Sequence, residues 1–234
     1  MRIVAILPAA GVGQRAAQSA QQKPKQYTEI NGKTMLQHST LALLQDPRLE
    51  RVYISVAAQD PYIEDYVWPE QVQILKQGGV TRAHTVLQSL AHLLSQQLLD
   101  PHDWVLVHDA ARPALKAQAL GRLIDHCLAA HQGGILALPI ADTVKRAKCA
   151  ESSPAQIAST LDRRQLWLAQ TPQMFPAQAL HDALAQGLAQ GANITDEASA
   201  IEQQGAEVLL IKGHWENLKV TWPEDFALVA HFLD

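Results

Sequence analysis

The feature that most constrains the fold of this 234-residue chain is a repeated alternation of short apolar runs and amphipathic segments. Residues 2–7 form a nearly continuous apolar run, as expected of a strand buried on both faces of a sheet. Further strands are predicted at 51–57, 72–75, 104–107, 135–138 and 207–211, and helices at 35–44, 81–97, 115–130, 176–190, 195–204 and from Pro223 onward. This alternation predicts an α/β protein with a doubly wound, mostly parallel, Rossmann-like sheet.

One segment interrupts the alternation. Between residues 139 and 162, polar and apolar residues alternate over short distances, and 143–147 and 156–160 predict the two sides of a hairpin. We interpret this segment as a protruding β-hairpin arm that leaves the domain. Because the sequence shows no internal repeat and no long linker, residues 1–234 are predicted to form one domain with an arm at 139–162.

Charge and cysteine usage exclude several classes of protein. The formal net charge of −4 does not favour a general nucleic-acid binder. The two cysteines, Cys127 and Cys149, provide neither a disulfide framework nor a cysteine-rich zinc site, which suits a reducing compartment. No apolar run reaches 18 residues, and the first one ends at Pro8. We therefore expect no membrane association and a cytoplasmic location.

The residues after the first predicted strand have the composition of a phosphate-binding loop. Residues 8–13 read Pro-Ala-Ala-Gly-Val-Gly, and such small residues let consecutive backbone amides approach an anion closely. Arg15 would add a guanidinium, and the rigid Pro24 beside Lys25 can aim an ammonium back at this loop. Each feature alone also fits an ordinary turn, but together they predict an anion-binding site beyond the carboxyl end of the strand.

Two other classes of protein remain open on these residues. The spacing Gly11-x-Gly13-x-x-Ala16 satisfies the loose dinucleotide fingerprint of an NAD(P)-dependent oxidoreductase. The polar segment that follows, with Pro24, argues against the apolar helix that such a fold needs. A nucleotide-binding module without catalytic activity is the other alternative. Such a module would not need the second set of cations that the sequence offers at Arg112, Arg163 and Lys219.

The motifs of this chain resemble those of 2-C-methyl-D-erythritol 4-phosphate cytidylyltransferases over nearly its whole length. The resemblance rests on the first loop, Pro24-Lys25-Gln26-Tyr27, and the segments 107–113, 142–146, 162–163, 170–173, 194–199 and 217–221. It implies a nucleotidyltransferase sheet, transfer of a cytidylyl group from CTP to this polyol phosphate, Mg²⁺ as cofactor, and a homodimer formed through arm exchange. A cytidylyltransferase that acts on ribitol 5-phosphate is the nearest alternative.

The resemblance also implies roles for individual residues. Arg15, Lys25, Lys219 and Arg163 would be the catalytic cations, with Arg15 and Lys25 holding the triphosphate. CTP would be bound by Pro8, Ala9, Ala10, Gly11, Val12, Gly13, Gly78, Gly79, Thr85, Asp109 and Ala110. The sugar phosphate would be bound by Arg112, Thr143, Arg163, Thr171 and Thr195, and Asp109 would be the metal ligand.

Several of these residues also have simpler interpretations. Asp109 fits a helix N-cap, Arg163 fits an ion pair with Asp162, and Thr195 fits a helix start. His108 is interpreted as structural, since the attacking phosphate is already an anion and needs no general base. Val80 stands where the family often has an acidic residue, so a contact to the base there would come from the backbone.

Overall fold

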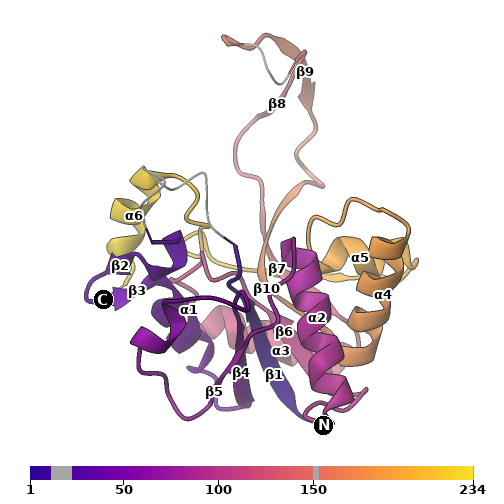
Figure 1. The fold of residues 1–234 in the computed structure, drawn as a ribbon. Coiled ribbons are helices and arrows are strands. Elements are labelled where there is room, and N and C mark those ends of the chain that lie inside the picture. Colours follow the sequence, from indigo (N-terminus) through magenta and orange to yellow (C-terminus); the bar gives the residue numbers. More distant parts are fainter. Residues whose placement is uncertain (12–22, 150–152, 234) are drawn as a thin grey trace.

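A seven-stranded sheet forms the centre of the computed structural model, which describes residues 1–11, 23–149 and 153–233 (Figure 1). The strands follow the order β11-β7-β10-β6-β1-β4-β5. Their bounds are β1 Ile3–Pro8, β4 Leu49–Ser55, β5 Val72–Leu75, β6 Trp104–Val107, β7 Gly134–Pro139, β10 Trp167–Pro176 and β11 Leu209–Lys212. β10 runs antiparallel to both of its neighbours, and the other pairs are parallel. The predicted doubly wound, mostly parallel sheet is therefore confirmed.

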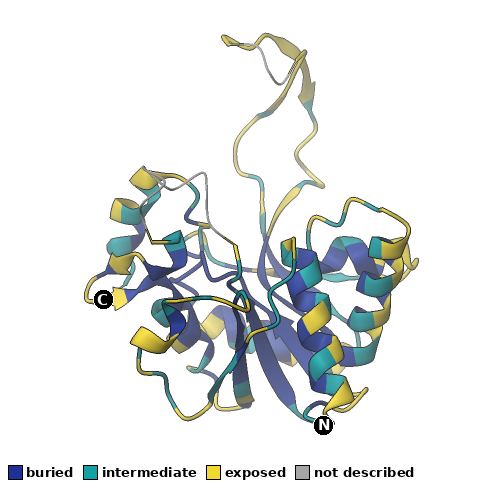
Figure 2. Ribbon diagram, in the orientation of Figure 1, coloured by how far each residue is buried: buried dark blue, intermediate teal, exposed yellow. Residues whose placement is uncertain are grey.

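Helices cover both faces of this sheet. They are α1 Met35–Leu43, α2 Arg82–Ser95, α3 Ala117–Ala130, α4 Ala177–Ala189, α5 Glu197–Gln203 and α6 Pro223–Ala230. The side chains of β1 alternate between the two layers: Leu7 belongs to the core packed under α1 and α3, and Ile6 to the core under α2 and α4. Because both faces are covered, β6 is buried along its length and β1 is buried as far as Leu7 (Figure 2).

The order of the strands fixes where a ligand can bind. From β1 the chain continues to β4 and β5 on one side, and β6 then returns to the other side of β1. Connections that leave neighbouring parallel strands in opposite directions open a crevice beyond their carboxyl ends. The segments that follow β1 and β6, beginning with Ala9 and His108, therefore face each other across this crevice.

The structure contains one central strand that the sequence did not predict. β10 lies between β6 and β7, although it contains Pro172, which cannot donate to a sheet hydrogen-bond ladder. The pairing with β7 is irregular between Ala169 and Gln173, and this irregularity accommodates the proline. A small antiparallel hairpin was also not predicted. Its strands, β2 (Glu29–Ile30) and β3 (Lys33–Thr34), have two residues each.

The predicted arm is a hairpin that projects from the body of the molecule (Figure 1). β8 (Val144–Ala147) and β9 (Ile157–Leu161) pair with each other in a separate two-stranded sheet. Most of their residues are exposed, including Ile157 at 61 % (Figure 2). The arm leaves the sheet after β7 and returns before β10. Within the described residues, no helix is long and apolar enough to cross a membrane.

Candidate active site

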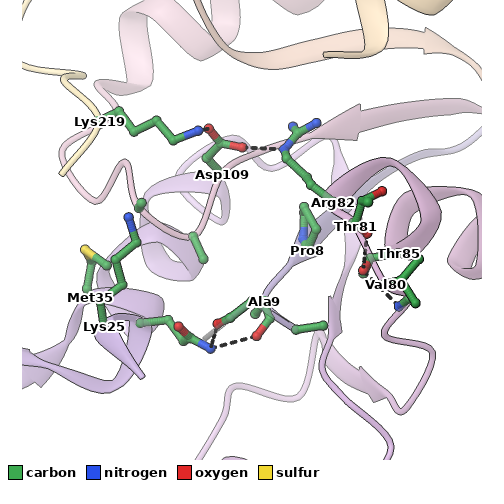
Figure 3. A pocket seen from close by; sticks show the side chains of 16 residues that line it. Pro8, Ala9, Lys25, Met35, Val80, Thr81, Arg82, Thr85, Asp109 and Lys219 are labelled. Atoms are coloured by element: carbon green, nitrogen blue, oxygen red, sulfur yellow. Dashed lines mark hydrogen bonds and ion pairs between the residues drawn. The ribbon is translucent and has the colours of Figure 1, made fainter. Parts of the chain in front are cut away.

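A pocket of about 650 Å³ lies where β1 and β6 end (Figure 3). Ten residues predicted from the sequence line it: Pro8, Ala9, Ala10, Gly11, Lys25, Gly79, Thr85, Asp109, Ala110 and Lys219. They come from the loop after β1, the 3₁₀ turn η1 (Lys25–Tyr27), the start of α2, the end of β6 and the segment before α6. Segments far apart in the sequence thus meet at the switch point of the sheet. Val12, Gly13 and Arg15 lie outside the described residues.

Gln26 connects the first loop to the lysine segment. Its buried amide nitrogen donates to the carbonyl oxygens of Ala9 at 2.8 Å and Gly11 at 3.0 Å. The neighbouring Lys25 donates from Nζ to the carbonyl oxygen of Val220 at 2.8 Å, next to Lys219 in the sequence. Two predicted catalytic lysines are therefore held at one pocket by short hydrogen bonds between segments. Sequence reasoning assigned no role to Gln26.

Asp109 is surrounded by positive charge. Its Oδ1 accepts from Arg82 Nε at 2.8 Å, and its Oδ2 lies 2.8 Å from Lys219 Nζ (Figure 3). Arg112 Nε lies 3.7 Å from Oδ2. Burial alone would raise the pKa of the Asp109 carboxyl, but these three cations outweigh burial and hold the pKa far below its ordinary value. Asp109 is therefore a carboxylate throughout the physiological pH range.

Arg112 and Thr171 lie behind the pocket rather than in its lining. Arg112 donates to the carbonyl oxygens of Asn217 at 2.6 Å and Ala169 at 3.3 Å. The buried hydroxyl of Thr171 accepts from the backbone N–H of Asp109 at 3.0 Å. Both residues, which were predicted to bind the sugar phosphate, hold the segments that carry Asp109 and Lys219.

His108 is fully buried and completes this support. Its Nε2 lies 3.0 Å from the carbonyl oxygen of Arg112, which can only accept, so Nε2 carries the proton. Nδ1 then accepts from the hydroxyl of Thr171 at 2.9 Å. Burial lowers the pKa of His108 to about 4. The ring is therefore neutral, and both of its nitrogens are engaged within the protein, in agreement with the structural interpretation.

This histidine predicts a pH dependence of stability. At a pH between the folded pKa of about 4 and the ordinary value of 6.5, the unfolded chain binds one proton that the folded chain does not. The free energy of unfolding should therefore fall as the pH drops from about 6.5 toward 4, by about 3 kcal/mol at 1.36 kcal/mol per pKa unit. Urea unfolding of the wild type and of His108→Asn at several pH values measures this contribution. An equally steep loss in both proteins would show that His108 is not its source.

The glycines at 78 and 79 are required by close packing. A Cβ on Gly78 would lie 2.5 Å from Cβ of Ala10 and 2.8 Å from Cα of Ala57. A Cβ on Gly79 would lie 2.5 Å from Cβ of His84. The absence of side chains thus lets this strand-to-helix turn pack against both the first loop and the first turn of α2.

Two side chains that follow these glycines, Thr85 and Val80, differ in whether they can contact a ligand in the pocket. Thr85 is buried, and its hydroxyl accepts from the N–H of Gly79 and donates to the carbonyl oxygen of Thr81, both at 3.0 Å. It therefore fixes the turn at the pocket wall. Val80 is 89 % exposed at the pocket, where it presents no side-chain acceptor to a base.

The other three predicted sugar-phosphate residues also lie outside the pocket lining. Thr143 and Arg163 are exposed on or beside the arm, and Thr195 is exposed just before α5. Asp162 pairs with Arg164 rather than with Arg163, through a contact of 2.5 Å between Oδ2 and the guanidinium. The alternative interpretation of Arg163 as the partner of Asp162 is therefore not supported.

Two charged residues at the site were missed by sequence reasoning. Arg82 is the first residue of α2 and Glu197 the first residue of α5, and the two form an ion pair beside Asp109. Arg82 was included only in the predicted helix at 81–97, and Glu197 only in the family motif at 194–199 and the predicted helix at 195–204, without a role of its own. For Arg82 the available signal was a charged residue at the start of a helix that follows a strand, at the carboxyl edge of the sheet where functional side chains gather. Glu197 gave no such signal, because α5 follows α4 and not a strand.

The fold and the site together define a nucleotidyltransferase with a Rossmann-like sheet. A model of the 2-C-methyl-D-erythritol 4-phosphate cytidylyltransferase family matches residues 3–234. The chain belongs to this family.

Individual relatives agree over almost the full length. The chain is 46 % identical over 232 residues to the 2-C-methyl-D-erythritol 4-phosphate cytidylyltransferase of Vibrio vulnificus strain YJ016, covering 99 % of this chain and 94 % of that one. It is 47 % identical over 233 residues to the enzyme of the same name from Bordetella pertussis strain Tohama I, covering 99 % and 98 %.

Solved structures agree as well. A structure titled 4-diphosphocytidyl-2C-methyl-D-erythritol synthase has a TM-score of 0.84 and 41 % identity, with coverage of 100 % of this chain and 99 % of that one. The 2-C-methyl-D-erythritol 4-phosphate cytidylyltransferase of Francisella tularensis has a TM-score of 0.82 and 28 % identity, with coverage of 99 % and 100 %. The likeness therefore extends to the arrangement of the whole chain.

Proposed function

We propose that this protein transfers a cytidylyl group from CTP to 2-C-methyl-D-erythritol 4-phosphate, with release of diphosphate, in non-mevalonate isoprenoid biosynthesis. The observation that carries the proposal is the family match over residues 3–234, together with a pocket at the sheet switch point that is lined by eight of the eleven residues predicted to bind CTP. The relatives are named for methylerythritol phosphate, which favours this acceptor over ribitol 5-phosphate. The family match also argues against an NAD(P)-dependent oxidoreductase and against a module without catalytic activity.

The pocket suits a reaction that needs positioning and charge rather than a protein nucleophile. A phosphate oxygen of the acceptor forms the new bond to the α-phosphorus of CTP, while the bond from that phosphorus to the β-phosphate oxygen breaks. The attacking group is already an anion, so no proton has to be removed. Lys25 and Lys219, with Arg15, would hold the triphosphate and stabilise the charge that builds up in the transition state.

The donor set at the pocket fits Mg²⁺. Within the described residues, no group of three or more His, Cys, Asp or Glu side chains is arranged to hold a metal. Mg²⁺ often binds through one or two carboxylates together with substrate phosphates and water, and Asp109 supplies one such carboxylate. We propose Asp109 as the protein ligand. When bound, the metal would neutralise negative charge on the triphosphate.

Replacing Asp109 by asparagine tests this assignment. The substitution keeps the size of the side chain but removes its charge, so the gain in CTP affinity that Mg²⁺ provides should fall by about tenfold or more. Titration calorimetry with CTP, with and without Mg²⁺, measures that gain in the wild type and the variant. The same gain in both proteins would remove Asp109 from the metal site.

We further propose that the active site is shared between two subunits of a homodimer. Thr143 and Arg163 lie on or beside the arm, which projects away from the body that carries the pocket (Figure 1). An isolated two-stranded hairpin is at best marginally stable in water, so a second copy of the chain is the simplest surface for it to pack on. Arg163 and Thr143 would then bind the sugar phosphate in the partner's site. From cysteine usage, we propose a cytoplasmic location.

The proposed activity is tested with CTP, Mg²⁺ and a panel of polyol phosphates, by following diphosphate release. We expect release with 2-C-methyl-D-erythritol 4-phosphate and little with the other acceptors. Faster release with ribitol 5-phosphate would establish the alternative acceptor. Binding of CTP without turnover of any acceptor would identify a nucleotide-binding module instead.

A further inference from the structure

Arg82 joins two acidic residues at the wall of the pocket. Its Nε donates to Oδ1 of Asp109 at 2.8 Å. Its two terminal nitrogens donate to the two carboxylate oxygens of Glu197, at 2.6 and 3.0 Å. The guanidinium therefore uses its end-on fork for Glu197 and a single donor for Asp109. Figure 3 shows Arg82 on the side of Asp109 opposite Lys219.

Glu197 is held firmly in this position. It is fully buried at the first position of α5, and the preceding Asp196 caps the helix by accepting from the N–H of Ser199 at 3.0 Å. Gln173 of β10 donates to Asp196 at 2.8 Å and accepts from the N–H of Ala198 at 2.8 Å. The start of α5 is thus attached to the central sheet on both sides of Glu197.

Stability alone is a weak explanation for a buried ion pair at this place. Removing two charges from water costs free energy that their attraction often does no more than offset. Arg82 lines the pocket, whereas Glu197 is not part of the lining and pairs with Arg82 behind it. The geometry therefore favours another explanation: Glu197 acts, through Arg82, on the carboxylate of Asp109.

The geometry shows what Glu197 prevents. An arginine fork can bind both oxygens of one carboxylate, which is its strongest mode of pairing. As long as Glu197 occupies the terminal nitrogens of Arg82, Asp109 receives one hydrogen bond from Arg82 on Oδ1, and its Oδ2 forms an ion pair with Lys219 at 2.8 Å. Without the charge of Glu197, the fork is free to turn onto both oxygens of Asp109.

The charges around Asp109 also indicate that Glu197 affects this carboxylate. Three cations, Arg82, Arg112 and Lys219, face Asp109, and Glu197 provides the second negative charge of the cluster. If Glu197 were neutral, its negative charge would no longer offset the positive charge of Arg82 near Asp109, so the site would attract any other cation less strongly.

We propose that Glu197 is a positioning residue which, by holding the guanidinium fork of Arg82, keeps the carboxylate of Asp109 available to the Mg²⁺ that accompanies CTP. This role rests on the proposed function, because it requires a metal–nucleotide complex at Asp109. Under this proposal Arg82 and Glu197, the first residues of α2 and α5, act together on Asp109. Arg82 is the link through which Glu197 acts.

The proposal is tested by binding measurements on Glu197→Gln, which keeps the shape of the side chain and removes its charge. The gain in CTP affinity that Mg²⁺ provides should fall by about 10–100-fold, as is usual when a group supporting a metal ligand is lost. Binding of CTP without Mg²⁺ should be unchanged or tighter, since the pocket becomes more positive. Titration calorimetry with CTP, with and without Mg²⁺, provides both values. Glu202→Gln, at an exposed position of the same helix, is the matched control and should behave as the wild type.

A second variant separates positioning from a structural role. In Arg82→Met/Glu197→Gln the fork is absent, so Asp109 cannot be captured by it, and most of the Mg²⁺-dependent gain should return. If the ion pair is purely structural, the gain in CTP affinity that Mg²⁺ provides should be no larger in the double variant than in Glu197→Gln. The double variant also leaves no unpaired buried charge at these two positions, so it stays testable if Glu197→Gln folds poorly.

Two results would overturn the proposal: an unchanged Mg²⁺-dependent gain in Glu197→Gln, or no recovery in the double variant. Turnover of the wild type is measured in parallel with CTP and methylerythritol phosphate. An inactive wild type would contradict the proposed function itself. An active wild type with a variant that binds Mg²⁺ and CTP normally would contradict only the role of Glu197.

Discussion

Replacement of Lys25 by alanine is expected to lower kcat by about 10²–10³-fold, the usual effect of removing one group aimed at transition-state charge. Lys25 lines the pocket, and its Nζ is held 2.8 Å from the carbonyl oxygen of Val220, beside the segment that carries Lys219. The ammonium is therefore fixed where the triphosphate is proposed to lie. Arg15→Ala should have a similar effect, as the family resemblance implies.

The effect on CTP binding should be much smaller than the effect on kcat. A cation that binds ground state and transition state equally would change affinity and leave kcat almost unaltered. Steady-state kinetics and CTP titrations on Lys25→Ala separate the two cases. Lys33→Ala is the matched control, because Lys33 is exposed on β3 and lies outside the pocket. A variant at position 25 with near-normal kcat would show that Lys25 does not stabilise the transition state.

Mixing two inactive variants should restore activity if each site is built from two chains. Lys25→Ala and Arg163→Ala homodimers are each expected to be nearly inactive. When equal amounts are unfolded and refolded together, about half of the dimers combine one chain of each kind. Each mixed dimer then has one site with both defects and one with neither, so activity should return to roughly a quarter of the wild-type value.

Arg164, next to Arg163 in the sequence, provides a control for the refolding experiment. Arg164 is 86 % exposed at its side chain and pairs with Asp162, so Arg164→Ala should retain activity both alone and in mixtures. Exchange of subunits is verified by mass-tagging one chain. Refolded mixtures that contain mixed dimers but no activity would place Lys25 and Arg163 in the same chain's site and would contradict the shared site.

Local sequence signals predicted several elements well, for reasons visible in the structure. The helix predicted at 35–44 is α1, and Thr34 and Gln37 form a capping box at its start, with hydrogen bonds of 2.9 and 3.1 Å. Pro223 opens α6 at its first position, as predicted. The apolar runs at 72–75 and 104–107 coincide with β5 and β6. In each case the residues that specify the element lie within it or next to it.

The predictions were less complete where a feature depends on distant partners. β10 is a strand because β6 and β7 bind it on both sides, while Pro172 within it gives a local signal against a strand. Thr171 was predicted to bind substrate, and its motif gave no sign that its hydroxyl is occupied by His108 and by the backbone of Asp109. Such contacts arise only after the sheet has assembled.

The sequence by itself determined the alternating α/β architecture, the projecting hairpin, the family and most of the pocket lining, because each of these follows from periodicity or from contiguous motifs. Only the tertiary structure decided how the charges are distributed around Asp109. Arg82 and Glu197 are 115 residues apart in the chain, and the strand order brings the starts of α2 and α5 together at one edge of the sheet. An ion pair acts over a few ångströms in space, and a one-dimensional pattern holds no record of that distance.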